Sequence, residues 1–137
     1  MEPALQSLES RRTQLYRKLE ALGDFRRGII SVNYRKCGKS NCACAQKDHP
    51  GHGPQYLWNA SVGGKTKSLN LPLGPELEKV GREVERYGEF DRLCQELVQV
   101  NDQICRLRPA PVIDDENELE QLKKKLRRHF AKKRRKR

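Results

Sequence analysis

Three cysteines and two histidines crowd into one short segment of this 137-residue chain. The segment reads Cys37-Gly38-Lys39-Ser40-Asn41-Cys42-Ala43-Cys44 and is followed by His49 and His52. Thiolates and imidazoles are the preferred ligands of tetrahedral zinc, and short spacings let a single loop supply several of them. We therefore expect one structural Zn²⁺ ion, with the ligands Cys37, Cys42, Cys44 and His52.

The identity of the fourth ligand and the role of the cluster each leave an alternative open. His52 is favoured because it lies just before the next expected strand, whereas His49 lies in a looser Asp-His-Pro stretch. Buried or free cysteines and a redox switch compete with the metal interpretation, although no separate resolving cysteine lies near the group. Four protein ligands close a zinc site to water, which favours a structural over a catalytic role.

The remaining chemistry-bearing residues do not form a recognisable catalytic set. Cys94 and Cys105 are eleven residues apart on an expected helix, about three turns, so they cannot share a metal, and we expect both to be small buried residues. There is no Ser/His/Asp order, phosphate-binding glycine loop or pair of carboxylates in a pocket-like context. We expect that the protein is not an enzyme.

The residues around the cluster predict strands between two long helices. Leucines at three- and four-residue steps predict a helix with a coiled-coil seam from about Pro3 to Leu22, interrupted by Arg12. Apolar and polar residues alternate from Ile30 to Arg35, and Gln55–Val62 is a second aromatic and apolar run. Gly63-Gly64 predicts a two-residue hairpin turn to a third strand, Lys65–Leu71.

A second long helix follows the strands. It is expected from about Pro75 to Arg108, and its wide apolar stripe suits packing against the first helix. After the stiff Pro109–Pro111 linker, Asp114 or Asp115 can cap a third helix, and we expect Ala131–Arg137 to be disordered when free.

These elements predict an α+β fold. A small zinc-bound, three-stranded antiparallel β-knuckle would lie between two long helices that pair antiparallel, with a basic C-terminal helix or tail. The corresponding segments are an N-terminal helix (1–24), the β-knuckle (25–74), the long helix (75–108), and the linker with its basic helix (109–137). With 35% hydrophobic and 34% charged residues, the chain has little core of its own, so a metal, a helical pairing or a partner must add stability.

The net charge of +11 is concentrated in two places. Residues 123–137 hold eleven Lys/Arg and no acid, whereas the rest of the chain has as many acidic as basic residues. A second cluster of basic residues, without any acid, lies between Phe25 and Lys47. Two basic regions indicate a polyanionic partner, most often nucleic acid, and a solvated face or solubility tail is the alternative.

Aromatic residues lie beside these cations, and aromatic rings can stack unpaired bases while cations meet phosphates. Trp58 serves equally well as a core residue or as a contact. The candidate nucleic-acid contacts are Arg26, Arg27, Arg35, Lys36, Lys39, Tyr56, Lys65, Lys67, Lys132, Lys133, Arg134, Arg135, Lys136 and Arg137.

Several short motifs resemble those of one family. They are Arg27-Gly28, Tyr34-Arg35-Lys36-Cys37-Gly38-Lys39, Cys42-Ala43-Cys44-Ala45, His52-Gly53-Pro54 and Gly64-Lys65-Thr66. The segment from about 25 to 105 resembles an uncharacterised family of short bacterial and phage proteins, known only as a domain of unknown function. The resemblance implies that His52 is the fourth ligand and that the source is prokaryotic or viral; it implies no activity.

The sequence therefore predicts a small zinc-stabilised nucleic-acid-binding accessory protein, for DNA or RNA, that works beside a larger nucleic-acid enzyme of a mobile element or phage. The alternative is a helical adaptor or homo-oligomer that acts through protein contacts, with zinc purely structural. No apolar run suits a signal peptide or a membrane span, so we expect a cytoplasmic protein without a membrane partner. In that reducing compartment, cysteines favour metal binding over disulfides.

Overall fold

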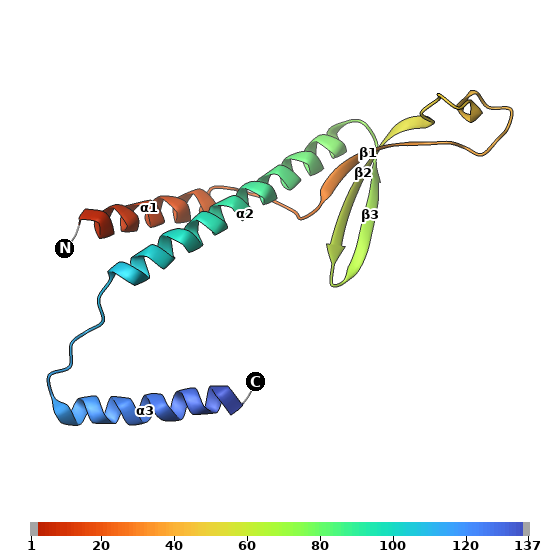
Figure 1. Cartoon of the computed structure of the whole chain (residues 1–137). Coiled ribbons are helices and arrows are strands. Elements are labelled where there is room, and N and C mark those ends of the chain that lie inside the picture. The colour runs from red at the N-terminus through yellow and green to blue at the C-terminus, as the bar shows by residue number, and fades with distance from the viewer. Residues whose placement is uncertain (1–2, 136–137) are drawn as a thin grey trace. The chain divides into compact units, whose positions relative to one another are not determined.

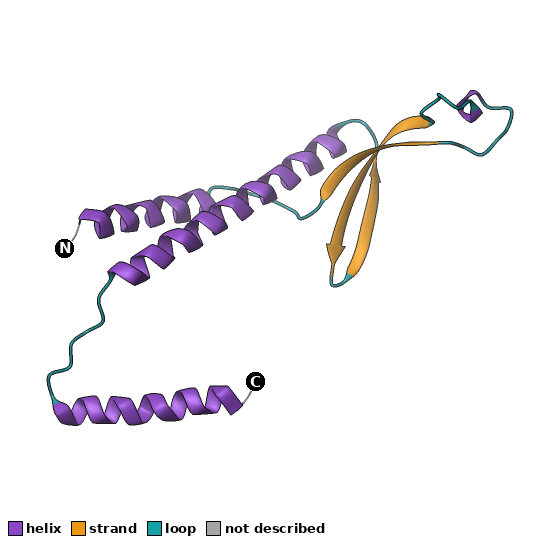
Figure 2. Cartoon of the chain, in the orientation of Figure 1, coloured by secondary structure: helices purple, strands orange, loops and turns teal. Residues whose placement is uncertain are grey.

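A computed structural model describes the backbone of residues 3–135 and the side chains up to Lys132. The elements are α1 (Pro3–Glu20), β1 (Ile29–Arg35), the short 3-10 turn η1 (Ala43–Ala45), β2 (His52–Val62), β3 (Lys65–Leu71), α2 (Pro75–Leu107) and α3 (Glu116–Arg135) (Figures 1 and 2). The chain divides into two units, residues 1–104 and residues 105–137. The fold is α+β, as the sequence predicts.

The core of the first unit lies between α1 and α2. Leu5 and Leu15 of the predicted leucine seam are fully buried, and they pack in one cluster with Leu93, Val100 and Ile104 of α2. Leu8, Leu19, Leu22 and Leu97 pack around this cluster and are partly buried. The seam is therefore covered from within the same chain.

Polar contacts fix the antiparallel register of the two helices. Arg12, which interrupts the seam, donates from Nη1 to Asn101 Oδ1 at 3.1 Å. Its neighbour Arg11 donates from Nε to Glu96 Oε2 at 2.7 Å. After α1 ends, the chain continues to Phe25, whose ring stacks on that of Phe90 at 4.7 Å between centroids. Residues later in the first segment thus meet residues earlier in α2, as an antiparallel pair requires.

The wide apolar stripe of α2 is only partly used. The edge with Leu93, Val100 and Ile104 is buried, whereas Val98 on the adjacent edge is 60% exposed. Cys94 is half-buried, and Cys105 is exposed. The expectation that Cys105 is buried is wrong, because its position follows Ile104 and points off the face that packs on α1.

The three strands form one antiparallel sheet in the order β1-β2-β3. Val62 pairs with Lys65 across the Gly63-Gly64 turn, where both glycines have a positive φ, as the predicted hairpin requires. The β1–β2 ladder ends at the pair Arg35–His52, after a bulge between Asn33 and Arg35. The cysteine-rich loop, here called the knuckle (residues 36–51), thus connects the far ends of β1 and β2. The second strand begins at His52, three residues earlier than predicted.

The register places several large apolar residues of the sheet on one face. Ile30, Trp58 and Leu69 form one row of that face, because directly paired residues point to the same side. A Cβ added at Gly81 would lie 3.9 Å from Ile30 Cδ1, so the first turns of α2 lie against this face. Leu71 and Val80 are 2% and 1% exposed at the same end of the sheet.

One acidic residue joins the helical pair to the strand segment. The backbone carbonyl of Glu83 accepts from the Arg26 amide at 3.1 Å, and its carboxylate lies 2.9 Å from Arg26 Nε. Lys79 Nζ donates to the other carboxylate oxygen at 2.9 Å. The Lys79 hydrogen bond, together with the charge of Arg26, lowers the pKa of Glu83 despite the burial of this side chain.

The second unit contains α3. Asp115 Oδ1 accepts from the Asn117 amide at 2.9 Å and so caps the helix, as one of the two predicted acids. The helix continues to Arg135, so the expectation of disorder from Ala131 is wrong up to that residue. Lysine and arginine are good helix formers, and cations favour a helix C-terminus. Among the described helices, none is long and apolar enough to cross a membrane.

We predict that Glu83→Gln lowers the free energy of unfolding at pH 7 by about 1–3 kcal/mol, because the neutral amide cannot form both ion pairs. The pKa of Glu83 is lowered in the folded chain, so its stabilisation is present above the unfolded pKa of about 4.3 and is lost as the pH falls through the folded value. The denaturant-unfolding curves of the variant and the parent should therefore converge on acidification.

Glu78→Gln is the matched control for this measurement. Glu78 lies on the same helix, but its side chain is 71% exposed and pairs with Arg82, four residues on. Its loss should cost less than about 0.5 kcal/mol at every pH. Equal effects of the two substitutions at pH 7 would contradict the role of Glu83.

Candidate metal centre and basic surface

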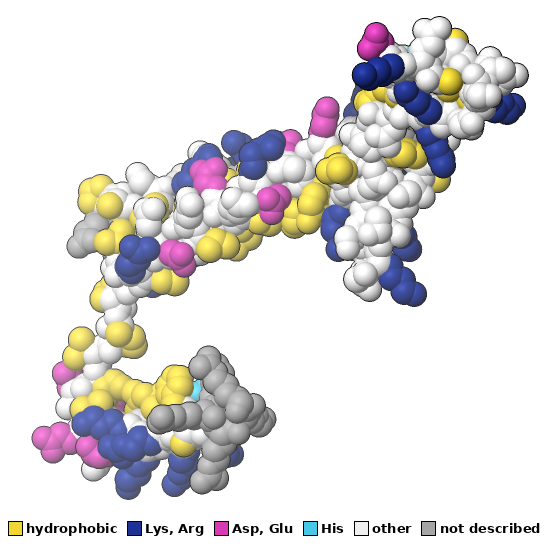
Figure 3. All heavy atoms as spheres, turned by 45° about the vertical axis from the view of Figure 1, so that its right-hand side comes forward, with side chains coloured by type: hydrophobic (Ala, Val, Ile, Leu, Met, Phe, Trp, Pro, Cys, Tyr) yellow, Lys and Arg dark blue, Asp and Glu magenta, His cyan; other side chains and the backbone are white. Residues whose placement is uncertain are grey.

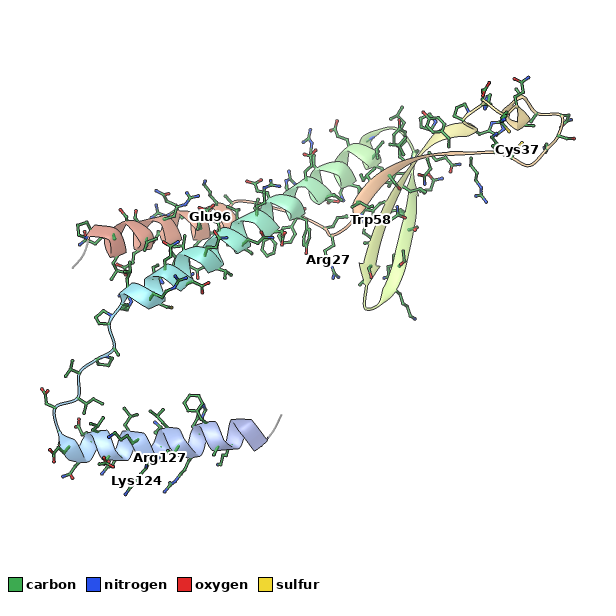
Figure 4. All side chains as sticks on the ribbon, viewed as in Figure 1. Arg27, Cys37, Trp58, Glu96, Lys124 and Arg127 are labelled. Atoms are coloured by element: carbon green, nitrogen blue, oxygen red, sulfur yellow. The ribbon has the colours of Figure 1, made fainter. Side chains whose placement is uncertain are left out.

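The knuckle brings four ligand-type side chains together at the ends of β1 and β2. Cys37 lies two residues after β1, and His52 is the first residue of β2. Cys42 directly precedes η1, and Cys44 lies within it. The ladder pair Arg35–His52 holds the imidazole beside the end of β1. Figure 4 shows Cys37 in this loop, beyond the end of the strands.

The ligand atoms have the spacing of a tetrahedral site. All four lie within 4.8 Å of one another. Cys37 Sγ is 3.5 Å from Cys44 Sγ, and Cys42 Sγ is 3.3 Å from His52 Nε2. Sulfur ligands of a tetrahedral metal with bonds near 2.3 Å lie about 3.8 Å apart. Cys37, Cys42, Cys44 and His52 are therefore positioned to hold a metal ion.

The alternative ligand, His49, lies outside this cluster. Its Nδ1 accepts from the Gly51 amide at 2.9 Å, a contact inside the turn that leads into β2. The choice of His52 over His49 agrees with this geometry, because His52 directs Nε2 at Cys42 while His49 serves the turn.

The surroundings of Cys37 and Cys44 shift the pKa values of these two thiols in opposite directions. The backbone amide of Lys39, with contacts from His52 and Cys44, lowers the pKa of Cys37 to about 6. The Cys37 amide donates to Cys44 Sγ at 3.4 Å and favours the thiolate, but burial and the adjacent sulfurs of Cys37 and Cys42 raise the pKa of Cys44. The lowered pKa of Cys37 favours its metal-binding thiolate form, whereas the raised pKa of Cys44 disfavours that form until a metal binds.

The chain belongs to the family described as a domain of unknown function (DUF6788), whose model matches residues 5–82. The match begins in α1, spans the whole sheet and the knuckle, and ends within α2, whereas the motifs noted above run from about 25 to 105. No curated protein and no solved structure matches the chain.

The structure separates the candidate nucleic-acid contacts into groups. Arg35, Lys36 and Lys39 are exposed at the knuckle, where Lys36 Nζ donates to the Gln46 carbonyl oxygen at 3.1 Å. Lys65 and Lys67 are exposed on β3. Of the C-terminal candidates, Lys132 is exposed on α3; the side chains of 133–135 and all of 136–137 lie outside the described residues.

The remaining candidates lie nearer the helices. Arg27 is exposed, whereas Arg26 is half-buried and paired with Glu83, so Arg26 is not a free phosphate contact. Tyr56 and Trp58 are half-buried on the face that α2 partly covers, so Trp58 is neither a full core residue nor a free surface residue.

Two aromatic residues beside Trp58 escaped the sequence analysis. Phe25 and Tyr87 line a pocket together with Trp58. Phe25 lies in an irregular segment with no periodicity to place it, and Tyr87 lies on α2, where the sequence predicts only a wide apolar stripe. The pairing of Phe25 with Arg26-Arg27 was the only local indication that a ring and cations meet here.

We predict that Cys42→Ser lowers the metal content from about one ion per chain to a small fraction of that value and lowers the unfolding midpoint. Cys42 is half-buried, so serine removes a ligand with little change in packing. The measurement is elemental analysis of the purified chain together with thermal unfolding.

Cys105→Ser is the control, because Cys105 is exposed and lies outside the cluster. It should retain both the metal and the stability of the parent. A Cys42→Ser chain that kept full metal content and full stability would show that the cluster is not a metal site.

Proposed function

We propose that this chain is a small, zinc-stabilised nucleic-acid-binding protein. The observation that carries the proposal is the segregation of charge within the first unit. Residues 25–75, which form the sheet and the knuckle, contain eight Lys/Arg and only one acid, Asp48. An exposed surface of one sign attracts a polyanion and raises its rate of association.

Zinc suits the donor set of the knuckle best. Three thiolates and one imidazole match a Cys₃His structural zinc site. Calcium and magnesium prefer oxygen ligands, and most iron–sulfur clusters need four cysteines. Four protein ligands complete the tetrahedral shell, so the ion would brace the loop rather than act on a substrate. The same elemental analysis that tests Cys42→Ser identifies the metal.

The basic residues extend along both ends of the sheet. Arg35, Lys36 and Lys39 lie at the knuckle end, and Lys65 and Lys67 lie at the hairpin end. Figure 3 shows Lys and Arg side chains over the sheet and knuckle, while acidic side chains are spread along the helices. The eleven residues of β2 span about 33 Å, which is long enough for several nucleotides to contact both ends.

In this proposal the chain acts as an accessory to a larger nucleic-acid enzyme. The sheet and knuckle would supply the oriented contacts. The basic end of α3 and the residues after it would add affinity with little sequence preference, because such contacts go to phosphates.

We predict that the double substitution Lys65→Glu/Lys67→Glu weakens binding to a fluorescent 20-nucleotide DNA or RNA by at least about tenfold. Each lost phosphate contact should also reduce the slope of log affinity against log salt by about 0.7–0.9. Fluorescence anisotropy at several salt concentrations measures both quantities.

The double substitution Arg17→Glu/Lys18→Glu on α1 is the matched control, since it changes the net charge equally away from the sheet. It should weaken binding much less. Equal weakening by the two double substitutions would show that only the net charge matters and not its position on the sheet. If the parent chain showed no measurable binding at low salt, the proposal would be wrong.

A second candidate function, self-association, is favoured by α3. Leu126 and Phe130 are 41% and 59% exposed, and they lie on the same edge as Leu119 and Leu122. Glu116, Glu118 and Glu120 lie in the first half of the helix and the basic residues in the second. We infer that a second copy of α3 packs antiparallel along this edge, which brings Glu120 of one helix near Arg127 of the other.

We predict that the full chain shifts from monomer toward dimer with rising concentration, and that Leu126→Glu keeps it monomeric. Light scattering at several concentrations measures the mass against the monomer value of 15.9 kDa. Leu73→Glu, at a position that is 79% exposed outside the helices, is the control and should leave the equilibrium unchanged. A parent chain that is monomeric at all concentrations would exclude this pairing.

A further inference from the structure

A pocket of about 340 Å³ opens where the loop after α1 meets the sheet and α2. Its walls are aromatic on two sides: Phe25 and Tyr87 on the helix side, and Trp58 on the sheet side. Ala60 and Val62 of β2 also line the pocket, and Arg26 and Arg27 complete the lining. This volume is at the small end of the range for ligand sites and is sufficient for one planar heterocycle.

The Trp58 ring is held in place by its neighbours. Its Nε1 donates to the Arg27 carbonyl oxygen at 2.9 Å. Gly28 allows this approach, because a Cβ at Gly28 would lie only 2.4 Å from Trp58 Nε1. Figure 4 places Trp58 on the sheet near the loop that carries Arg27. An aromatic wall that is fixed in advance loses little entropy when a ligand stacks on it.

Arg26 adds a second flat surface to the pocket. Its guanidinium lies 5.2 Å from the centre of the Trp58 ring, and the ion pair with Glu83 anchors it there. On the opposite side, Phe25 is fixed by stacking on Phe90, and its ring lies 5.9 Å from that of Tyr87. The pocket therefore presents flat π surfaces and a guanidinium plane, which suit a flat heterocycle better than a branched side chain.

Cations lie at the rim. Arg27 is exposed. Lys67 pairs directly with Ala60 across the β2–β3 ladder, so its side chain lies on the same face of the sheet as Ala60. A flat aromatic site with cations at its rim has the composition of sites that hold one base of a single strand while its phosphates meet Lys or Arg.

We propose that this pocket holds one unpaired nucleobase of a single-stranded nucleic acid, with the adjoining phosphates at Arg27 and Lys67. This inference rests on the proposed nucleic-acid function and adds a specific base site to it. It also implies a preference for single strands, because a paired base would first have to leave its stack.

The test uses the full-length, metal-loaded chain and the intrinsic fluorescence of Trp58, the only tryptophan. The probes are a labelled 20-nucleotide single strand, an abasic strand of the same backbone length, and the corresponding duplex. The single strand should quench Trp58 as it binds and should bind at least about fivefold more tightly than the abasic strand. Anisotropy of the label reports binding independently.

Tyr87→Leu is the diagnostic variant, because leucine keeps apolar bulk while removing the ring. It should weaken binding of the base-bearing strand about tenfold and leave the abasic strand and the salt slope unchanged. Tyr16→Ala is the control, since Tyr16 is 54% exposed on α1. Circular dichroism and metal content verify that each variant is folded.

The outcomes separate this inference from the proposed function. Salt-dependent binding without quenching of Trp58, and with equal affinity for the abasic strand, would overturn the base site and leave the proposed function standing. Equal quenching by duplex and single strand would likewise overturn it. The absence of binding to any probe at low salt would end both proposals.

Discussion

The contact between Arg26 and Glu83 connects the two halves of the first unit. Both the backbone and the side chain of Glu83 hold Arg26, while Lys79 shares the carboxylate. A carboxylate that is only 7% exposed is costly to bury unless cations and hydrogen bonds compensate it. Here the compensation comes from two elements that are distant in the sequence, so the contact fixes where the strand segment begins relative to α2. The position of Arg26 above Trp58 follows from it.

Because the core is small, the sheet and the knuckle depend on specific polar contacts and on the ligand cluster for stability. The helical pair buries its leucines well, but the sheet has only Ala60 and Leu71 among its buried apolar residues. A sheet of that size, with one face largely exposed, cannot hold a sixteen-residue loop by burial alone. A metal ion bound by the four clustered side chains would stabilise the loop instead, because the free energy of metal binding adds to the free energy of folding.

The sequence predicted those features that repeat locally. The leucine period placed α1 and the buried edge of α2, and the Gly63-Gly64 turn fixed β2 and β3 with their register. The spacing of Cys37, Cys42 and Cys44 predicted that the three thiols meet, and the position of His52 just before the next strand favoured it over His49 as the fourth ligand. In each case the residues that interact are close in the sequence or follow a regular period, so the pattern is visible without coordinates.

Long-range contacts were not predictable in the same way. Nothing around Glu83 distinguishes it from the other acids of α2 until Arg26 is placed against it. Phe25 and Tyr87 meet Trp58 only because three separate segments converge. The exposure of Cys105 depends on which face of α2 packs against α1. The extension of α3 to Arg135 depends on the helix propensity of lysine and arginine, which outweighs the repulsion between like charges.

The candidate metal centre and the aromatic pocket share strand β2, so both depend on the register of the sheet. Burial specifies the register of β2 only weakly, since Ala60 is the one buried residue of this strand. A slip of one residue would turn Trp58 to the opposite face and remove the pocket wall. The pair Arg35–His52 lies beyond the bulge at the far end of the same ladder, and a metal held by His52 and three thiolates would lock that end. In the proposed function, zinc therefore contributes to recognition without touching nucleic acid. It would keep β2, which carries Trp58, in register with β1, while the Gly63-Gly64 turn keeps Lys67 opposite Ala60.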